Sequence, residues 1–410
     1  MGYATGVFKK LALKRQASVG VKAPAGAAGT ARYMRRVTST LDLVKATYGS
    51  GEILPSQQRR DFRHGVRSVP GSISGELSVG GYQLPMESVL RRVATAGVTT
   101  GAVADIVIAS AGAGTKSGTI TRAGGTFLTT GFKIGDVVRQ TGPANANTNK
   151  NLLVTNATQT VLTVRTLDGS DLVAQAAAAG VTIAVAGRKT YTPEDGQTRD
   201  YYTVEHWFSD VPTSEQFTDV VFTGMTIGLP ATGMATVEFP LLGLDMQTSP
   251  GEYFTAPAAA PAGAIEAAVN GAIVVNGIVV ADVTGLTITV AGNHAAPGGV
   301  VGSNVDPDIF PGVLEVSGQL TALFRDASLR DLFVNETEFS IVGVFTGDNT
   351  AASGFTAFVM SRVKANGNTK DDVATGITQT IPFTALENVN GGAGTAHEKT
   401  TLSIQDSAWV

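Results

Sequence analysis

The chain contains no cysteine among its 410 residues. This absence excludes disulfides, thiolate metal sites and cysteine nucleophiles. Charged residues are also scarce, at 16%, and no run of about twenty uninterrupted apolar residues predicts a membrane span. The N-terminus carries lysines and arginines without an apolar core of signal-peptide length, so we expect no export through the Sec pathway. These absences favour synthesis in a cytoplasm.

Glycine is abundant, with 49 residues, and valine, threonine and alanine recur throughout the chain. Short runs of β-branched residues between glycine-rich turns are typical of strands. The composition therefore predicts a soluble, mainly β protein. Its length favours two or more modules.

The net charge of −4 conceals an asymmetry between the two parts of the chain. Residues 1–67 carry thirteen Lys or Arg against Asp42, Glu52 and Asp61, a net of +10, and the remainder carries −14. A basic N-terminal arm is compatible with nucleic-acid binding. However, this arm lacks interleaved aromatic residues and any nucleic-acid-binding motif. We therefore favour the interpretation that it contacts an acidic surface of the same body or of a neighbouring copy, through contacts that weaken at high salt.

Residues 313–345 are predicted to form a strand, a short helix and a second strand. Apolar and polar residues alternate over 314–322, which is the period of a half-buried strand. Asp326 is a candidate N-cap for a helix whose apolar residues have i, i+3, i+4 spacing (Leu329, Leu332 and Phe333).

A second unit of this kind lies at residues 72–95. Its sequence ISGELS at 73–78 matches VSGQLT at 316–321 position by position in residue type. Pro85 then suits the first turn of a helix. A match this short also arises by chance, but the helices that follow both copies favour an internal duplication.

The strand that should follow the first helix, at residues 201–208, comes far later in the sequence than its counterpart in the second unit. Short strand patterns separated by Gly, Asn and Asp turns fill the interval, as in a small barrel or sandwich. We interpret the interval as a domain inserted at a surface loop. The predicted organisation is an extended basic N-terminal arm at 1–34, a β-sandwich body at 35–100 and 191–387 with related units at 72–95 and 313–345, the inserted domain at 101–190 and a C-terminal tail at 388–410.

Two further expectations concern the ends of the chain. The arm should pack late or on a partner and should be followed by a strand at residues 35–44. The C-terminal tail should be loose over residues 388–394, and residues 401–410 end in the apolar pair Trp409 and Val410, which can dock on another surface.

Four features invite a search for chemistry, and none supports an active site. The glycine-rich sequence before Lys116 and Ser117 lacks the spacing and the strand–helix context of a phosphate loop, so we interpret it as a hairpin turn. The four histidines have no metal-ligand spacing, and His206 is expected to be packed within a strand. Asp371 and Asp372 suit a solvated turn, and no serine lies in a nucleophile elbow. The sequence predicts no catalytic, cofactor or metal site, and no enzyme.

The order of several motifs resembles the tail tube (major tail) proteins of long, non-contractile-tailed phages. These motifs are RRVTSTLDL at 35–43, GEIL at 51–54, the basic stretch that follows, and SISGELS at 72–78. The sequence VVNGIVVADVTGLTI at 274–288, then VGS at 301–303 and residues 311–333, continue this order. The sequence TFLTTGFKIGDVV at 126–138 is similar to small β modules carried by phage virion proteins.

The resemblance implies a tail-tube-type β-sandwich or barrel with a flanking α-helix, extended N- and C-terminal arms and an inserted small all-β domain. It implies a structural virion protein that self-assembles into hexameric rings stacked as a tail tube. Such a tube encloses the tape-measure protein, meets the tail terminator and distal tail proteins, and conducts DNA during ejection. The expected location is the virion tail, after synthesis and assembly in the host cytoplasm, without stable membrane association.

Two other functions remain open at this point. One is a β-rich surface-binding protein of the adhesin type, with residues 101–190 as its recognition module. The other is a glycan-active enzyme, which requires two carboxylates at a suitable separation.

Overall fold

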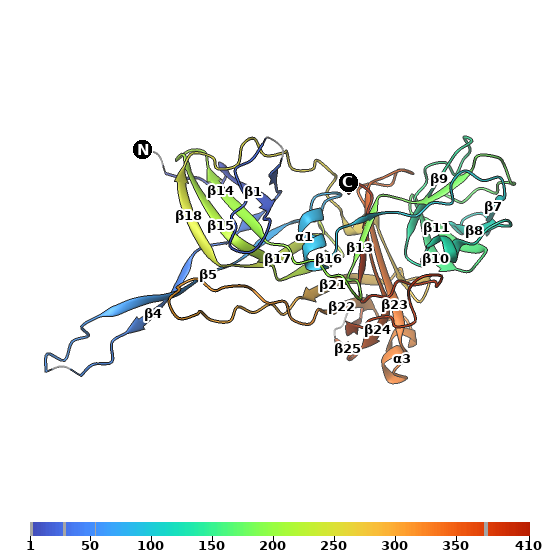
Figure 1. The fold of residues 1–410 in the computed structure, drawn as a ribbon. Coiled ribbons are helices and arrows are strands. Elements are labelled where there is room, and N and C mark those ends of the chain that lie inside the picture. Colours follow the sequence, from blue (N-terminus) through green and yellow to red (C-terminus); the bar gives the residue numbers. More distant parts are fainter. Residues whose placement is uncertain (1–2, 28–29, 54, 373–375) are drawn as a thin grey trace.

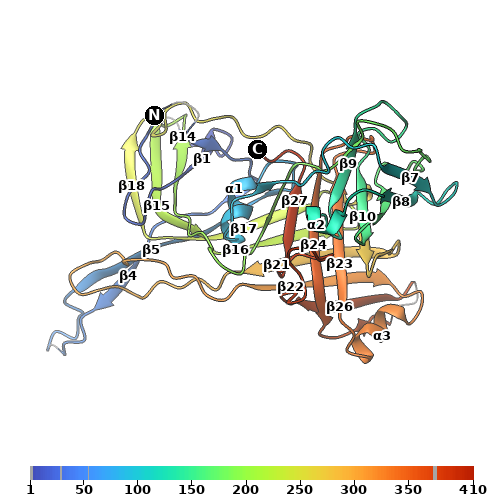
Figure 2. The same cartoon turned by 45° about the vertical axis from the view of Figure 1, so that its right-hand side comes forward.

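The structure, a computed structural model, describes residues 3–27, 30–53, 55–372 and 376–410. Strands make up 45% of the chain and helices 5%, and the strands form several antiparallel sheets. This confirms the predicted mainly β fold with few helices. A long body carries a separate small sheet at one end and a projecting hairpin at the other (Figures 1 and 2).

The N-terminal half of the body combines one early strand with a hairpin and a group of strands that lie after residue 200. Strands β1, β14, β15, β17 and β5 are hydrogen-bonded neighbours in that order, and β16 also pairs with β17. The elements of this half are β1 (Lys9–Arg15), β2 (Arg32–Tyr33), β3 (Thr38–Ser39), β4 (Val44–Gly49), β5 (Phe62–Glu76), α1 (Gln83–Val89), β14 (Tyr202–Phe208), β15 (Thr213–Phe222), β16 (Gly224–Pro230), β17 (Thr236–Gly243) and β18 (Asp245–Pro250).

The C-terminal half begins after a linker at residues 251–270. Strands β19, β23, β24, β26 and β22 are neighbours in that order. Its elements are the short 3-10 helix η1 (Ala268–Asn270), β19 (Gly271–Val275), β20 (Ile278–Val279), β21 (Val283–Ala291), β22 (Glu315–Leu323), α3 (Ser328–Val334), β23 (Phe339–Thr346), β24 (Phe355–Ala365), β25 (Thr369–Lys370), β26 (Thr378–Ala385) and β27 (Ser403–Asp406). One continuous hydrophobic core joins the two halves, because it contains buried residues of both (Ile73 and Phe239 with Leu320 and Phe383).

Residues 106–185 form a separate six-stranded sheet in the order β12, β9, β10, β11, β8, β7. The sheet encloses its own core, which includes Ile120, Phe132 and Leu162. Its strands alternate buried and exposed residues, as period-two sequences do. Its elements are β7 (Ile106–Ser110), β8 (Ser117–Arg122), the short helix α2 (Phe127–Thr130), β9 (Val137–Thr141), β10 (Leu152–Ala157), β11 (Val161–Thr166) and β12 (Thr182–Val185), with β6 (Thr95–Ala96) and β13 (Arg188–Tyr191) at the two connections to the body.

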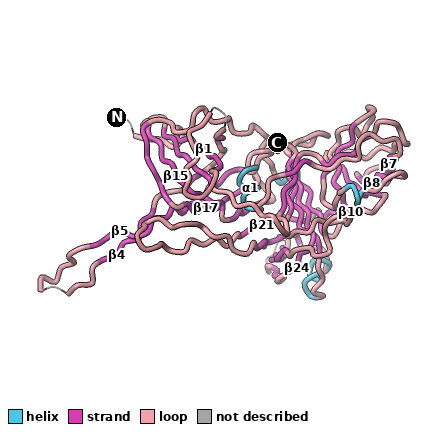
Figure 3. The backbone as a smooth tube through the Cα atoms, viewed as in Figure 1, coloured by secondary structure: helices cyan, strands magenta, loops and turns pink. Residues whose placement is uncertain are grey.

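The hairpin formed by β4 and the first half of β5 extends away from the body (Figures 1 and 3). Every residue of β4 is exposed, and the hairpin bears exposed apolar side chains at Val44, Tyr48 and Phe62. A long loop at residues 292–314 runs toward the hairpin base, where the Arg67 N–H donates to the Asn304 carbonyl (2.8 Å). The hairpin itself has no packing partner among the described residues beyond this base.

The predicted N-terminal arm at 1–34 needs correction in its middle part. Residues 9–15 form β1, which pairs along its full length with β14, and Leu11 and Leu13 are buried in the main core. The flanking lysines conceal this short alternation in the sequence. Residues 1–2 and 28–29 of the predicted arm lie outside the described residues.

Three other boundaries differ from expectation. Within the predicted strand at 35–44, only Thr38–Ser39 forms β3, which pairs with β5, and Val44 already begins β4. The helix α3 begins at Ser328, and Asp326 accepts a hydrogen bond from the Ser328 N–H (2.9 Å) without being its N-cap. In the C-terminal tail, β27 pairs with β13 and β24, and Trp409 is buried, which confirms that it docks.

Candidate functional site

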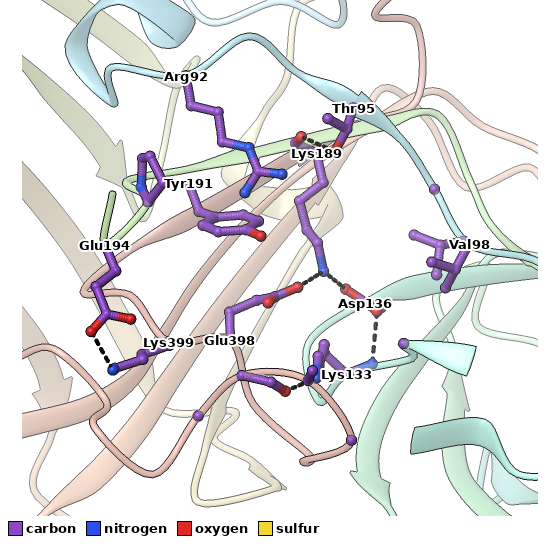
Figure 4. A pocket seen from close by; sticks show the side chains of 18 of the residues that line it. Arg92, Thr95, Val98, Lys133, Asp136, Lys189, Tyr191, Glu194, Glu398 and Lys399 are labelled. Carbon is purple, nitrogen blue, oxygen red and sulfur yellow. Dashed lines mark hydrogen bonds and ion pairs between the residues drawn. The ribbon is translucent and has the colours of Figure 1, made fainter. Parts of the chain in front are cut away.

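A cavity of about 700 Å³ lies where the six-stranded sheet meets the body. Among its lining residues, the Lys189 amine lies 2.7 Å from Asp136 Oδ1 and 2.9 Å from Glu398 Oε1 (Figure 4). The Lys133 amine donates to carbonyl oxygens of the C-terminal tail. The cluster therefore ties together β13, the six-stranded sheet and the tail.

The electrostatics of this cluster indicate a structural role. Burial lowers the pKa of Lys189, but Asp136 and Glu398 raise it by more, so the amine stays protonated. Asp136 also accepts a hydrogen bond from the Lys133 N–H (2.8 Å). A protonated lysine that is ion-paired with two carboxylates supplies neither a base nor a nucleophile. Breaking these ion pairs would leave a buried charge without a partner. Sequence reasoning missed the cluster because its members come from three distant segments without a local motif.

The glycine-rich sequence before Lys116 forms the turn between β7 and β8, and no helix follows it. Its backbone N–H groups at Gly114 and Lys116 donate to the Asp171 carboxylate (2.8 and 3.1 Å). A carboxylate of the protein thus occupies the donors that a phosphate would need, as expected for a hairpin turn.

The histidines are dispersed, and no group of three or more His, Asp or Glu suited to a metal occurs in the described part of the chain. His206 is buried in β14, where its Nε2 lies 2.8 Å from Ser39 Oγ. Burial lowers the pKa of His206. His294 is also desolvated, and burial together with Arg91 lowers its pKa to about 4. Both rings are neutral, packed side chains near neutral pH.

The acidic pair Asp371 and Asp372 is exposed beside β25, and residues 373–375 of the same turn lie outside the described residues. Asp371 accepts hydrogen bonds from the N–H and the hydroxyl of Thr378 (both 2.7 Å), and these bonds lower its pKa. The carboxylate therefore closes the turn between β25 and β26, in agreement with the expected solvated turn.

The basic N-terminal residues have different surroundings. Two of them pair with acidic residues of the body: Arg15 lies 3.1 Å from Asp200, and Arg67 lies 2.8 Å from Asp245. Others, such as Lys14 and Arg36, donate to backbone carbonyl oxygens. Arg59 and Arg60 instead lie exposed on the projecting hairpin. For Arg15 and Arg67 the acidic partners lie in the same body. No helix in the described ranges is long and apolar enough to cross a membrane.

The surfaces that stand out are the exposed hairpin and the sheet edges at β3 and β25. A family model for phage tail tube proteins matches residues 9–385. The chain belongs to the phage tail tube protein family. No curated protein sequence matches this chain.

Membership of the tail tube family gives the protein its general role. A tail tube protein self-assembles into a tube, associates with other tail components and resides in the virion tail. The match covers residues on both sides of the six-stranded sheet, so it spans both halves of this tail tube protein.

Proposed function

We propose that this tail tube protein forms closed rings of six-fold symmetry that stack into the tube. The tube encloses the tape-measure protein, ends at the terminator and distal tail proteins, and conducts DNA during ejection. Assembly takes place in the host cytoplasm, and the role is structural rather than catalytic. The observation that carries the proposal is the projecting hairpin, whose apolar side chains are exposed in the isolated chain. Exposed apolar surface of this kind marks a protein interface.

Two kinds of contact are required for stacked rings. Head-to-tail contacts close a ring, and a second contact joins one ring to the next. The hairpin is suited to the second contact because it extends beyond the body and carries Arg59 and Arg60 on an otherwise acidic protein. The negative net charge of the remainder also suits a lumen through which DNA passes, because like charge discourages phosphate binding.

We also propose that residues 101–190 are a peripheral domain inserted into the body. Its six-stranded sheet has its own core and meets the body through an apolar cluster, the Lys189 ion pairs and hydrogen bonds such as those of Gln405 with Val137. The strand β13, at the end of this range, pairs with β27 of the body. Removal of the domain should leave tubes that are thinner. Loss of all assembly in a deletion variant that still folds would contradict this assignment.

Negative-stain microscopy of the purified full chain tests the function. We expect rings or tubes with a central hole. Protein that stays monomeric under all conditions, also with other tail components present, would overturn the proposal. A variant in which residues 50–61 are replaced by a short Gly-Ser turn should retain the fold, form rings and fail to stack.

The truncation that best tests the N-terminus ends before β1. Removing residues 1–30 would delete β1 and expose the core under Leu11 and Leu13. Removing residues 1–8 leaves β1 intact, so we expect a folded protein that assembles less well. Normal assembly of the shorter truncation would exclude a role for this segment.

A further inference from the structure

The two halves of the body repeat one pattern of strand pairing. The order β1, β14, β15, β17, β5 in the N-terminal half corresponds to β19, β23, β24, β26, β22 in the C-terminal half. On the outer side, β18 pairs with β15 as β27 pairs with β24. The helix α1 packs on β15, and α3 packs on β24. The sequence similarity of the two strand–helix units thus extends to the topology of whole halves.

Local details match as well. The pairing of β14 with β15 shifts register between Tyr202 and Val204, and that of β23 with β24 shifts between Phe339 and Ile341, at the same place in each half. The eight-residue strands β17 and β26 both begin with threonine and have proline at the fifth position. A bulge and a strand proline are specific features that chance rarely places alike.

Two backbone hydrogen bonds are repeated at these matched positions. The Thr223 N–H donates to the Pro240 carbonyl (2.9 Å), as the Asn366 N–H donates to the Pro382 carbonyl (2.7 Å). At the other end of the same strands, the Leu77 N–H donates to the Ala235 carbonyl (2.8 Å), as the Phe324 N–H donates to the Ile377 carbonyl (2.9 Å). The two prolines therefore define the residue-by-residue correspondence of the halves.

This correspondence places Gly71 opposite Leu241 and Gly318 opposite Phe383, so the two glycines are counterparts. A Cβ at Gly71 would lie 2.7 Å from the Leu41 backbone, and a Cβ at Gly318 would lie 2.2 Å from the Thr287 carbonyl oxygen. Both glycines therefore allow the preceding strand to approach closely. The structural alignment differs by four residues from the match of ISGELS with VSGQLT, which keeps the same faces because the strand period is two.

The halves are joined to each other by one sheet junction, in which β16 pairs antiparallel with β21. Its register runs from Gly224 opposite Ala291 to Pro230 opposite Gly285. The counterpart of β16 in the C-terminal half is the segment at 366–372, which contains β25. The counterpart of β21 in the N-terminal half is the segment at 37–44, which contains β3. If the junction between β16 and β21 also has a counterpart, the segments at 366–372 and 37–44 form it.

Both segments are sheet edges. In the described residues β3 pairs only with β5, and β25 pairs only with β26. They terminate one run of eight neighbouring strands, in the order β3, β5, β17, β16, β21, β22, β26, β25. Val37 and Val44 are exposed along the first edge, and Thr369 and Lys370 along the second. Exposed edges at opposite ends of one sheet provide a head-to-tail pair of surfaces.

We propose that residues 366–372 of one chain pair antiparallel with residues 37–44 of the next chain, in the register of the internal junction of β16 with β21. Thr369 then lies opposite Asp42, as Thr226 lies opposite Thr289. The Lys9 amine, which donates to the Ser39 carbonyl (3.1 Å), covers this edge in the free chain and moves aside on pairing.

The inference rests on the proposed closed ring and changes the number of chains in it. Each chain supplies two equivalent units, and successive units around the ring are joined alternately within and between chains. A ring with six-fold repetition of the unit therefore contains three chains.

The chain has no cysteine, so disulfides can form only between cysteines that are introduced. The variant T369C/D42C should form disulfides between neighbouring chains of assembled, oxidised rings, because directly opposed residues have Cα atoms roughly 4.5–5.5 Å apart. Denaturing electrophoresis should show a ladder that ends at three chain masses. The control T369C/T38C keeps two exposed thiols but separates them by about 13 Å along the strand, so it should cross-link at least tenfold less.

The outcomes distinguish this inference from the proposed function. Rings that form normally without the T369C/D42C cross-link, or with equal cross-linking in the control, overturn the edge pairing and leave the ring intact. A ladder that ends at six chain masses supports the pairing and overturns the three-chain ring. Absence of rings in the unmodified protein overturns both proposals.

Discussion

The outer faces of the two halves have the same backbone and opposite chemistry. In the N-terminal half, Glu205 lies opposite Gln216, and at the corresponding positions of the C-terminal half Val342 lies opposite Val359. The segments that cover these faces explain the difference. Glu205 accepts hydrogen bonds from the backbone N–H groups of Tyr253 (2.6 Å) and Phe254 (3.0 Å), which belong to a segment without sheet partners.

The C-terminal half is covered instead by a folded sheet. Val342 and Phe355 pack against Val137 and Leu153 of the six-stranded sheet in one apolar cluster. The backbone groups of that sheet are already satisfied by its own strands, so it presents apolar side chains. The backbone N–H groups of an irregular segment need acceptors on the face that the segment covers. The backbone groups of a sheet are already paired within the sheet. The comparison teaches that the covering element decides the polarity of a strand face.

The largest expected effect comes from placing a carboxylate, as found on the outer face of the N-terminal half, on the apolar outer face of the C-terminal half. V342E buries a carboxylate among apolar side chains without a donor, and we expect a loss of about 4 kcal/mol in the free energy of unfolding, with separation of the six-stranded sheet from the body. Chemical unfolding and limited proteolysis measure both effects. V342A, which only removes methyl groups, should cost about 2 kcal/mol. Equal losses in the two variants would show that the face tolerates charge.

The reciprocal change tests the polar face. E205V leaves two backbone N–H groups and the Ser214 hydroxyl without their acceptor, and we expect a loss of about 3 kcal/mol. Chemical unfolding measures it, and faster proteolysis near residue 253 should accompany it. E205Q retains an acceptor oxygen and should recover at least half of the loss. Stability unchanged by E205V would contradict the role given to the covering segment.

The two helices sharpen the comparison further. Nearly all of α1 is buried beneath other segments, whereas Leu329 is the only buried residue of α3. M86A in α1 should therefore destabilise the protein by about 2 kcal/mol, and L332A in α3 by about 1 kcal/mol. Thermal and chemical unfolding of the isolated chain provide the test. If the assembled tube is destabilised more by L332A than by M86A, α3 is covered on assembly.

The smallest effect concerns the outer strands β18 and β27. Burial raises the pKa of Asp406 in β27 to about 6, in spite of hydrogen bonds from Gly80 and Ala408. The folded chain therefore binds this proton more tightly than the unfolded chain does. Stability conferred by the protonated form is present at about pH 4 and declines as the pH rises to about 6. Burial also raises the pKa of Glu266, which acts in the same direction.

Denaturation midpoints measured from pH 4 to 7 test this dependence. D406N should flatten the decline between pH 4 and 6 relative to the unmodified chain. The matched variant D245N in β18 replaces a carboxylate that pairs with Arg67, so it controls for the loss of one acidic side chain from an outer strand. If the decline in stability is unaltered in D406N, other carboxylates cause it.

Sequence patterns predicted the elements with clear alternation. The strand of residues 314–322, the helix after Asp326 and the β-rich interval before Tyr201 are all present because period-two and helical spacing report which side is buried. The edge strand β1 was missed, since its two buried leucines lie between lysines. The ion cluster of Lys189 was missed because charge pairing between distant segments leaves no local pattern.

The sequence alone determined the mainly β class, the lack of cysteine chemistry and the similarity between the two strand–helix units. These three properties follow from the composition and from the periodicity of residues along the chain, both of which can be read from the local sequence. Only the tertiary structure decided which strands are neighbours, that the whole halves share one topology, and that segments 37–44 and 366–372 end the sheet as open edges. Pairing between distant strands depends on register and on what covers each face, and these are properties of the folded chain.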